Sequence, residues 1–265
     1  SSRQIQIMSD LHLEHGQQYA TFDFPVTAPW LVLAGDIGRL VDYDKYHEFL
    51  RRQVDRYDRV FLVLGNHEFH GLTYEEGVER ALELSREPSL ASKLTLLHRR
   101  TWQDGDDGGP SQVVVMGCTL WSCIPASAKQ IVESKTSDFR NIKAWSVEKH
   151  NEIHAQEAAW LHDKLLHHSS SISNNTTPAE PNGRKKNRRN IIVVTHHAPS
   201  ADGTSSPAYA SNPWTFAFAT DVLPSLDLEV VKAWVFGHTH YTTDFFWNSV
   251  QVVANQRGYV LPGSK

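Results

Sequence analysis

The sequence is poor in cysteine, in long apolar runs and in net charge. Its two cysteines, Cys118 and Cys123, are too few for a disulfide framework or a zinc ribbon, so we expect reduced thiols in a cytosolic protein. No apolar run approaches the roughly 20 residues that cross a bilayer. No signal peptide opens the sequence, although a leader removed before Ser1 stays open. The formal net charge of −4 gives no general attraction to nucleic acid or anionic membrane.

Enough apolar residues are present for a large core. Of the 265 residues, 40% are hydrophobic, and this length suits one layered domain, predicted to span residues 1–265. The segment 169–190 is rich in Ser, Asn and Pro and then basic at 184–189. Such a segment cannot bury enough apolar surface to offset the entropy lost when it becomes ordered, so we predict a flexible basic surface insertion. The basic run leaves a nuclear localisation patch or a phosphate contact open.

Five short apolar runs each end in residues that can bind metals. The endings are Ser9-Asp10-Leu11-His12, Gly35-Asp36, Gly65-Asn66-His67-Glu68, Thr195-His196-His197 and Gly237-His238-Thr239-His240. The runs are typical of buried strands, and ligand sites assemble at the carboxyl ends of strands in open α/β sheets. Carboxylate, amide and imidazole donors delivered there predict a site for divalent metal.

Between these runs the sequence alternates helical and extended patterns. Helices are predicted over Tyr43 to Tyr57, from Thr73 onward with Val78, Leu82 and Leu84 on the apolar side, and over Val147 to His168. Strands are predicted over Leu94 to Leu97 and Val113 to Met116, and a hairpin over Thr242 to Trp247 and Val250 to Ala254. The periodicity by itself supports an α/β fold.

The five endings resemble, in order, the blocks of the calcineurin-like metallophosphoesterase superfamily. That family's blocks are D-x-H, G-D, G-N-H-[DE], H and G-H-x-H, and each has a counterpart among the five endings above. Ser9 to Glu14 and Thr119 to Trp121 look most like a branch of small intracellular phosphohydrolases. The resemblance implies an α/β fold, the four-layer αββα sandwich of the metallo-dependent phosphatase type.

The resemblance also implies two divalent metal ions. One ion would be bound by Asp10, His12, Asp36 and His240, and the other by Asp36, Asn66, His196 and His238. Asp36 would therefore bridge the two ions, which in such sites lie about 3.5–4 Å apart, clamp the phosphate and activate a water. Mixed nitrogen and oxygen donors favour Mn²⁺, with Fe or Zn²⁺ open.

His67 is the catalytic residue that the resemblance implies. In the family this histidine protonates or stabilises the leaving oxygen, and we expect Glu68 to orient it. The expected reaction is hydrolysis of a small-molecule phosphate ester or nucleotide, leaning to phosphodiesters because a general acid helps to expel a poor leaving group. A phosphomonoesterase stays open. A non-catalytic interaction scaffold is disfavoured, because all seven ligands and His67 are present.

Partners and location follow from the same observations. We expect no membrane partner and a cytoplasmic location, with the nucleus open because of the basic run at 184–189. Nucleic acid is an open but disfavoured substrate, and the oligomeric state stays open.

Other polar and aromatic residues carry weaker expectations. His15, His70 and His197 are expected behind the ligands or at the surface. Arg140 could pair a phosphate, but an ordinary surface ion pair within Asp138-Phe139-Arg140 is favoured.

Two further groups follow from their place in the sequence. Tyr209, Trp214 and Phe216 either wall the active site or pack in the core. The histidines on or near the longest helix are expected to be solvated; they are His150, His154, His162, His167 and His168.

Overall fold

Two β-sheets form the centre of the structure. The computed structural model describes residues 4–104, 113–173, 190–209 and 211–260. The first sheet is parallel and has the order β1 (Ile5–Met8), β2 (Trp30–Ala34), β3 (Arg59–Val63), β4 (Leu94–Leu96). The second has the order β5 (Arg100–Gln103), β6 (Val113–Cys118), β7 (Asn190–Thr195), β8 (Val231–Val235), β10 (Val250–Ala254), β9 (Thr243–Trp247). Its inner pairs are parallel, and β5 and β9 pair antiparallel at its edges.

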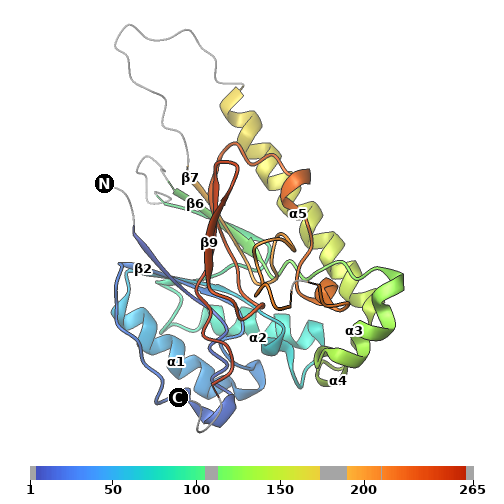
Figure 1. Ribbon diagram of the computed structural model, residues 1–265. Helices are drawn as coiled ribbons and strands as arrows, with labels where there is room; N and C mark the ends of the chain where they lie inside the picture. The colour runs from blue at the N-terminus through green and yellow to red at the C-terminus, as the bar shows by residue number, and fades with distance from the viewer. Residues whose placement is uncertain (1–3, 105–112, 174–189, 210, 261–265) are drawn as a thin grey trace, which may run out of the picture.

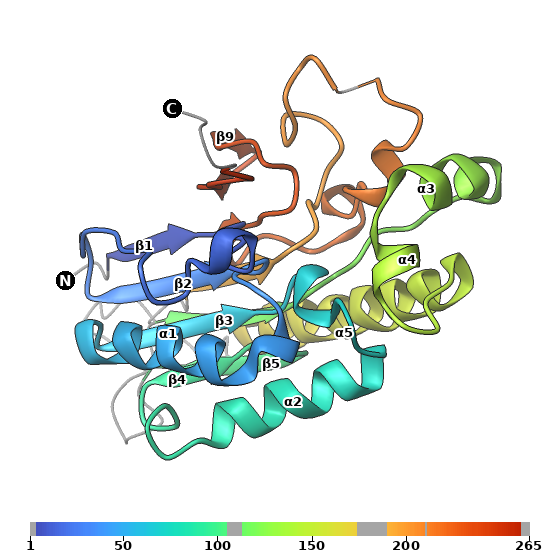
Figure 2. The same cartoon turned by 90° about the horizontal axis from the view of Figure 1, so that it is seen from below.

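Helices cover both outer faces of the paired sheets. The α-helices of the described residues are α1 (Tyr43–Arg56), α2 (Tyr74–Arg86), α3 (Lys129–Lys135), α4 (Asp138–Asn141) and α5 (Val147–Ser173). Figure 1 shows α1 and α2 on one side of the sheets and α5 on the other. In Figure 2, α1 and α2 run along the face of the first sheet.

Successive side chains along each strand point to opposite faces of the sheet, and this alternation produces three apolar interfaces between the layers. In β2, Leu31 and Leu33 belong to the cluster that includes α1 and α2, whereas Trp30 and Val32 pack against the second sheet. Along β6, Val114 and Met116 share a cluster with Leu161 and Leu165 of α5. The sequence of layers is therefore helix, sheet, sheet, helix, which confirms the predicted four-layer α/β sandwich.

Most predicted elements are present, with corrections at their edges. β1 was expected to be buried but is only half-buried, because it is the edge strand of the first sheet. Leu84 is buried and Val78 packs against the same core, as predicted, but Leu82 is exposed, since the buried side of α2 otherwise runs through Tyr74 and Ala81. The sequence also gave no signal for β5, a mostly polar edge strand that pairs only with β6.

The predicted insertion begins inside a helix. α5 continues to Ser173, so residues 169–173 are helical. The remainder of the insertion, 174–189, with its basic run, lies outside the described residues. Both cysteines are free thiols, Cys118 buried and Cys123 exposed. None of the helices in the described ranges is long and apolar enough to cross a membrane.

Candidate active site

Five strand ends from both sheets meet at one place. Asp10, Asp36 and Asn66 follow β1, β2 and β3 of the first sheet, and His196 and His238 follow β7 and β8 of the second. His12 and His240 are two residues further along their loops. All seven predicted ligands are therefore adjacent, and all but His240 are buried.

One group of donors consists of Asp10, His12 and His240. The Nε2 atoms of His12 and His240 lie 2.9 Å apart, and Nε2 of His240 is 3.4 Å from Oδ1 of Asp10. Oδ2 of Asp36 is 3.7 Å from Nε2 of His12. The ligand atoms of the three residues lie within 4.8 Å of one another, as the coordination of one ion requires.

A second group consists of Asp36, His196 and His238, with Asn66 beside them. Nε2 of His196 lies 3.3 Å from Oδ1 of Asp36 and 3.1 Å from Oδ1 of Asn66. Burial opposes ionisation of Asp36, but His196, His67 and His12, when protonated, hold its pKa well below the usual range. Because its two carboxylate oxygens face different groups, Asp36 is placed between them.

The hydrogen bonds of the imidazoles fit a pair of cations. Nδ1 of His196 is 2.8 Å from the carbonyl oxygen of Ala34, an acceptor, so Nδ1 carries the proton and Nε2 presents a lone pair to the site. Nδ1 of His12 similarly faces Oε1 of Glu14 at 3.3 Å, which leaves its Nε2 lone pair opposite His240. Lone pairs and carboxylates this close repel one another unless a proton or a metal cation lies between them, and two divalent ions would satisfy both groups.

The backbone is bent to aim these side chains. Asp10, His12, Asp36, His238 and His240 all have positive φ, between 48° and 72°. Such conformations are unfavourable for residues with a side chain and concentrate at functional sites. At Gly65, a Cβ would come within 2.2 Å of Oδ1 of Asp36, so the glycine of the G-N-H block leaves room for the carboxylate.

His67 lies at the edge of this cluster, held by groups at both ring nitrogens. Nδ1 is 2.8 Å from Oε1 of Glu14, and Nε2 is 3.1 Å from the hydroxyl oxygen of Tyr259. Burial lowers the basicity of His67, but the charges of Asp36 and Glu14 outweigh it and raise the pKa of His67 to about 9. This direction favours the protonated ring, the form from which a general acid gives its proton.

The family model for calcineurin-like phosphoesterases matches residues 4–242. The chain belongs to this family. Uncharacterized protein L509 of Acanthamoeba polyphaga mimivirus is 26% identical over 276 residues, which cover 97% of this chain and 91% of that protein. The crystal structure of phosphopantetheinyl hydrolase from Mycobacterium tuberculosis is similar in fold, with a TM-score of 0.65 and 16% identity over 96% of this chain and 89% of that chain. This phosphoesterase is a metal-dependent hydrolase of phosphoric esters.

Glu68 does not orient His67, contrary to the sequence prediction. Its carboxylate accepts hydrogen bonds from the backbone N–H groups of Asp36, Ile37 and Gly65 and from the hydroxyl of Tyr46. Glu68 thus ties the loops after β2 and β3 together. The partner of His67 is Glu14, whose side chain is only 6% exposed.

Asp138 is a buried site residue, although the sequence pattern favoured placing it in a surface ion pair. Its Oδ1 accepts from Nδ2 of Asn66 at 2.8 Å and lies 3.0 Å from Nε2 of His70. Because the amide nitrogen of Asn66 is engaged in this way, its Oδ1 is turned toward His196. The favoured expectation of an ion pair with Arg140 was wrong; Arg140 forms none within the described ranges and lines the site.

The histidines of α5 correct another expectation. His150, His154 and His168 are buried rather than solvated, whereas His162 and His167 are exposed. His150 accepts from the backbone N–H of Ser122, and Nδ1 of His154 lies 2.9 Å from the Leu120 carbonyl oxygen. His150 lies three residues before Ile153, His154 seven before Leu161 and His168 three after Leu165, so the buried histidines follow a helical stripe that was readable in the sequence.

The histidines flanking the ligands are distributed as expected. His70 is buried against Asp138, and the side chain of His15 is 44% exposed. His197 is fully buried, and its ring stacks on His238 with centroids 4.1 Å apart.

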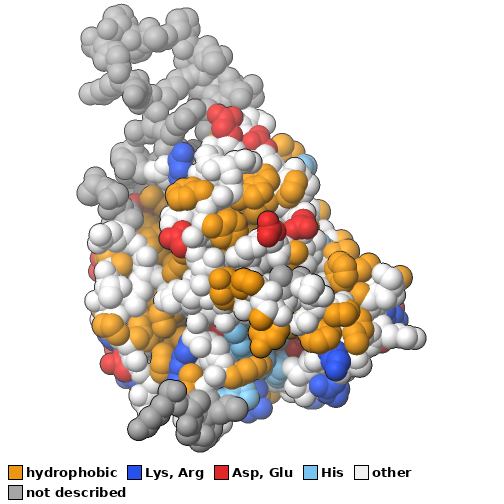
Figure 3. Space-filling view, viewed as in Figure 1, with side chains coloured by type: hydrophobic (Ala, Val, Ile, Leu, Met, Phe, Trp, Pro, Cys, Tyr) orange, Lys and Arg blue, Asp and Glu red, His pale blue; other side chains and the backbone are white. Residues whose placement is uncertain are grey.

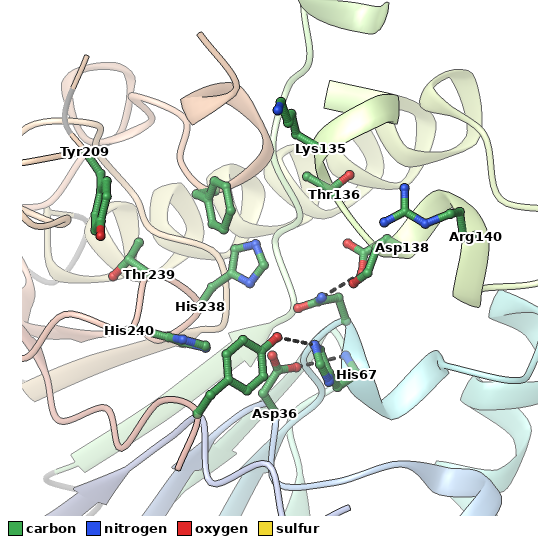
Figure 4. A pocket seen from close by; sticks show the side chains of 14 residues that line it. Asp36, His67, Lys135, Thr136, Asp138, Arg140, Tyr209, His238, Thr239 and His240 are labelled. Atoms are coloured by element: carbon green, nitrogen blue, oxygen red, sulfur yellow. Dashed lines mark hydrogen bonds between the residues drawn. The ribbon is translucent and has the colours of Figure 1, made fainter. Parts of the chain in front are cut away.

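A cavity of about 450 Å³ opens above the metal-ligand cluster. Asp36, His67, His238 and His240 lie in its floor, and Tyr209 forms part of its wall (Figure 4). Trp214 lines an adjoining cavity, but Phe216 lines neither; Phe218 takes that place, stacked on His238 at 4.8 Å.

Proposed function

We propose that this enzyme hydrolyses phosphodiesters of small molecules or nucleotides, with His67 as the general acid. The carrying observation is the placement of His67: its ring touches the proposed ligand His12, with centroids 4.4 Å apart, and faces the cavity with Nε2 directed at a hydroxyl group. A proton donor so placed can reach an ester oxygen of a phosphate bound above the cluster.

The proposed metal ligands are those implied by the family blocks. Asp10, His12, Asp36 and His240 would hold one ion; Asp36, Asn66, His196 and His238 would hold the other. When bound, the two ions would supply positive charge to the phosphoryl oxygens and an activated water. Nitrogen and oxygen donors in these proportions favour Mn²⁺, with Fe or Zn²⁺ as competitors.

Glu14 is proposed to position His67. It accepts the Nδ1 proton, which fixes the ring so that Nε2 delivers its proton to the substrate side. Bound metal ions would share the charge of Asp36, so Glu14 is the carboxylate left to act on His67. The pKa of Glu14 is lowered to about 2, because hydrogen bonds from His12 and His67 outweigh the effect of its burial. It therefore stays ionised across the working pH range.

The shape of the site favours a diester over a monoester. Cavities of about 270 and 710 Å³ adjoin the central one on two sides, sharing Tyr209 and Phe218 with it on one side and His67 and Arg140 on the other. A monoester would fill only one of them. Two ester groups on one phosphorus would occupy both.

The test compares bis(4-nitrophenyl) phosphate with 4-nitrophenyl phosphate, using enzyme loaded with Mn²⁺. We expect kcat/KM to be at least tenfold higher for the diester. A higher kcat/KM for the monoester would show that the enzyme is a phosphomonoesterase and not a phosphodiesterase. No turnover of either ester by protein that holds two ions per chain would favour the interaction scaffold.

A further inference from the structure

The two side cavities differ in chemistry. The cavity of about 710 Å³ beyond His67, here called the basic arm, is lined by Arg39, Arg140 and Lys143 with Glu14 as the only acid. The cavity of about 270 Å³ on the opposite side, here called the aromatic arm, is lined by Tyr209, Trp214 and Phe218 with small polar residues. Figure 4 shows Arg140 on one side of the central cavity and Tyr209 on the other.

The cations of the basic arm are available to a ligand. Arg39 is paired with Asp42 at 3.1 Å, and Glu14 is engaged with His12 and His67. Arg140 and Lys143 are exposed, and neither forms an ion pair with any acid in the part of the chain that the structure describes. In Figure 3, blue cationic side chains border the pale-blue histidines on this face of the molecule. Arg140 donates one hydrogen bond of 3.4 Å to the carbonyl oxygen of Ser134, and Lys143 interacts electrostatically with Glu76. The arm thus holds two cations that lack a direct ion-pair partner among the described residues, next to the proposed general acid.

The backbone that carries these cations is fixed to the active site. Between Arg140 and Lys143 the chain makes two hydrogen bonds to the segment that follows His67: Gly71 N–H donates to Asn141 at 2.7 Å, and Lys143 N–H donates to Leu72 at 2.8 Å. Asp138 adds its contacts to Asn66 and His70. A ligand group bound by Arg140 and Lys143 is therefore held at a set distance from His67.

The position of the acid decides which ester group each arm receives. His67 gives its proton to the leaving oxygen, so the leaving alcohol lies on the His67 side, where the basic arm begins. The retained group then lies toward Phe218 and Trp214. Aromatic side chains there offer faces for stacking or apolar contact, and Trp214 is already covered on one side by Nζ of Lys135, 5.4 Å from its ring.

From this arrangement we infer that the substrate is a diester with two unlike arms: a leaving alcohol that carries a second anionic group, bound by Arg140 and Lys143, and an apolar or aromatic group that stays on the phosphate. This inference rests on the proposed function. In the reaction, water adds to phosphorus, the P–O bond to the anionic alcohol breaks, and His67 protonates the released oxygen. The products are an apolar phosphate monoester and an anionic alcohol, and the proton lost by the water passes to solvent.

Two matched probes test the inference: benzyl 3-phosphopropyl phosphate and benzyl 3-hydroxypropyl phosphate. Both leaving oxygens in each probe are primary alkoxides, so bond strength gives little bias to the direction of cleavage. For the Mn²⁺-loaded enzyme we expect kcat/KM to be roughly tenfold or more higher for the phosphopropyl probe, the range of a charged hydrogen bond at a partly exposed site. Its products should be benzyl phosphate and 3-phosphopropanol.

Variants locate the effect. Arg140→Ala and Lys143→Ala should each lower the ratio of kcat/KM for the two probes several-fold, and the double variant should abolish it. Lys164→Ala removes a partly exposed positive charge on α5, paired with the neighbouring Asp163 and away from the cavities, and should leave the ratio unchanged. Lys143→Glu should reverse the preference toward benzyl 3-ammoniopropyl phosphate.

The outcomes separate the inference from the function beneath it. Equal kcat/KM for the two probes, or release of benzyl alcohol in place of benzyl phosphate, would overturn the inference. Cleavage of the probes would still support the proposed phosphodiesterase activity. A preference that survives the double variant would also overturn it. If the metal-loaded enzyme cleaves neither probe nor bis(4-nitrophenyl) phosphate, the diesterase and the inference fail together.

Discussion

The floor and the rim of this active site are built in different ways. The floor consists of the seven proposed ligands and stands on five strand ends, where neighbouring strands fix each backbone position. The rim, comprising Glu14, Asp138, Arg140, Lys143, Trp214 and Tyr259, comes from loops and short helices. As proposed ligands, the floor residues would act through bonds to ions that tolerate little displacement, whereas the rim residues would act on the floor or on the ends of a substrate. Variants of the floor should therefore abolish activity, and variants of the rim should change its selectivity.

The largest expected effect comes from the one floor residue that both groups of donors share. Asp36→Ala should lower the metal content from about two ions per chain to near zero, because each ion loses a carboxylate. Elemental analysis after dialysis, with circular dichroism to confirm folding, measures this. Full retention of one ion would show that Asp36 does not bridge. Asp10→Ala is the matched control and should remove mainly one ion.

His67 lies between floor and rim, and the fall in activity when it is replaced should depend on the leaving group of the substrate. His67→Asn should keep both ions, while turnover of an alkyl phosphodiester falls by roughly 10²–10⁴-fold. An activated nitrophenyl ester, whose leaving oxygen hardly needs a proton, should lose much less. Rates are compared at matched metal occupancy, since a loading defect would imitate the effect. Equal losses for both esters would leave His67 as a phosphate-binding group.

Asp138 tests whether a rim residue supports the floor. Asp138→Ala removes the acceptor that turns Asn66 toward the second group of donors. Metal affinity should weaken by roughly 10–100-fold, as for other groups that orient a ligand. Titration of the apo-enzyme with Mn²⁺ measures this, and only one of two binding steps should shift. Unchanged affinity at both steps would separate Asp138 from the metal centre.

The smallest expected effects are those of replacing two buried glutamates, Glu14 and Glu68, and the two variants should affect different properties. Glu14→Gln should slow alkyl diesters roughly tenfold, because His67 loses a charged partner. Without that charge the pKa of His67 falls, so the basic limb of the pH profile should move to lower pH. Glu68→Gln should instead lower the free energy of unfolding by roughly 1–3 kcal/mol, because an amide NH₂ would face backbone N–H donors. The ratio of its rates for alkyl and nitrophenyl esters should equal that of the unaltered enzyme. If Glu68→Gln changed this ratio and Glu14→Gln did not, Glu68 would be the residue that positions His67.

Local sequence determined the α/β elements and the strand ends that carry the floor residues, whereas the four layers and the ligand set were implied by the family resemblance. An apolar run followed by Gly and a donor residue is a strand and its exit loop, and both features are set within about ten neighbouring residues. The glycine at position 65 is explained by its closeness to the Asp36 carboxylate. The helix predicted from Thr73 onward is α2, and it begins with a capping box formed by Thr73 and Glu76. For the same reason the hairpin of β9 and β10 lies where the sequence predicted it.

Only the tertiary structure decided what supports His67 and what surrounds the substrate. The partner of His67 is Glu14, 53 residues away, rather than the adjacent Glu68, and its other contact, Tyr259, is 192 residues away. Asn66 and Asp138 are 72 residues apart. Such pairs follow no periodic pattern, because they form where loops from different layers meet at the strand ends. Which of two nearby carboxylates reaches an imidazole depends on backbone direction over a few ångströms, and packing of the four layers sets that direction.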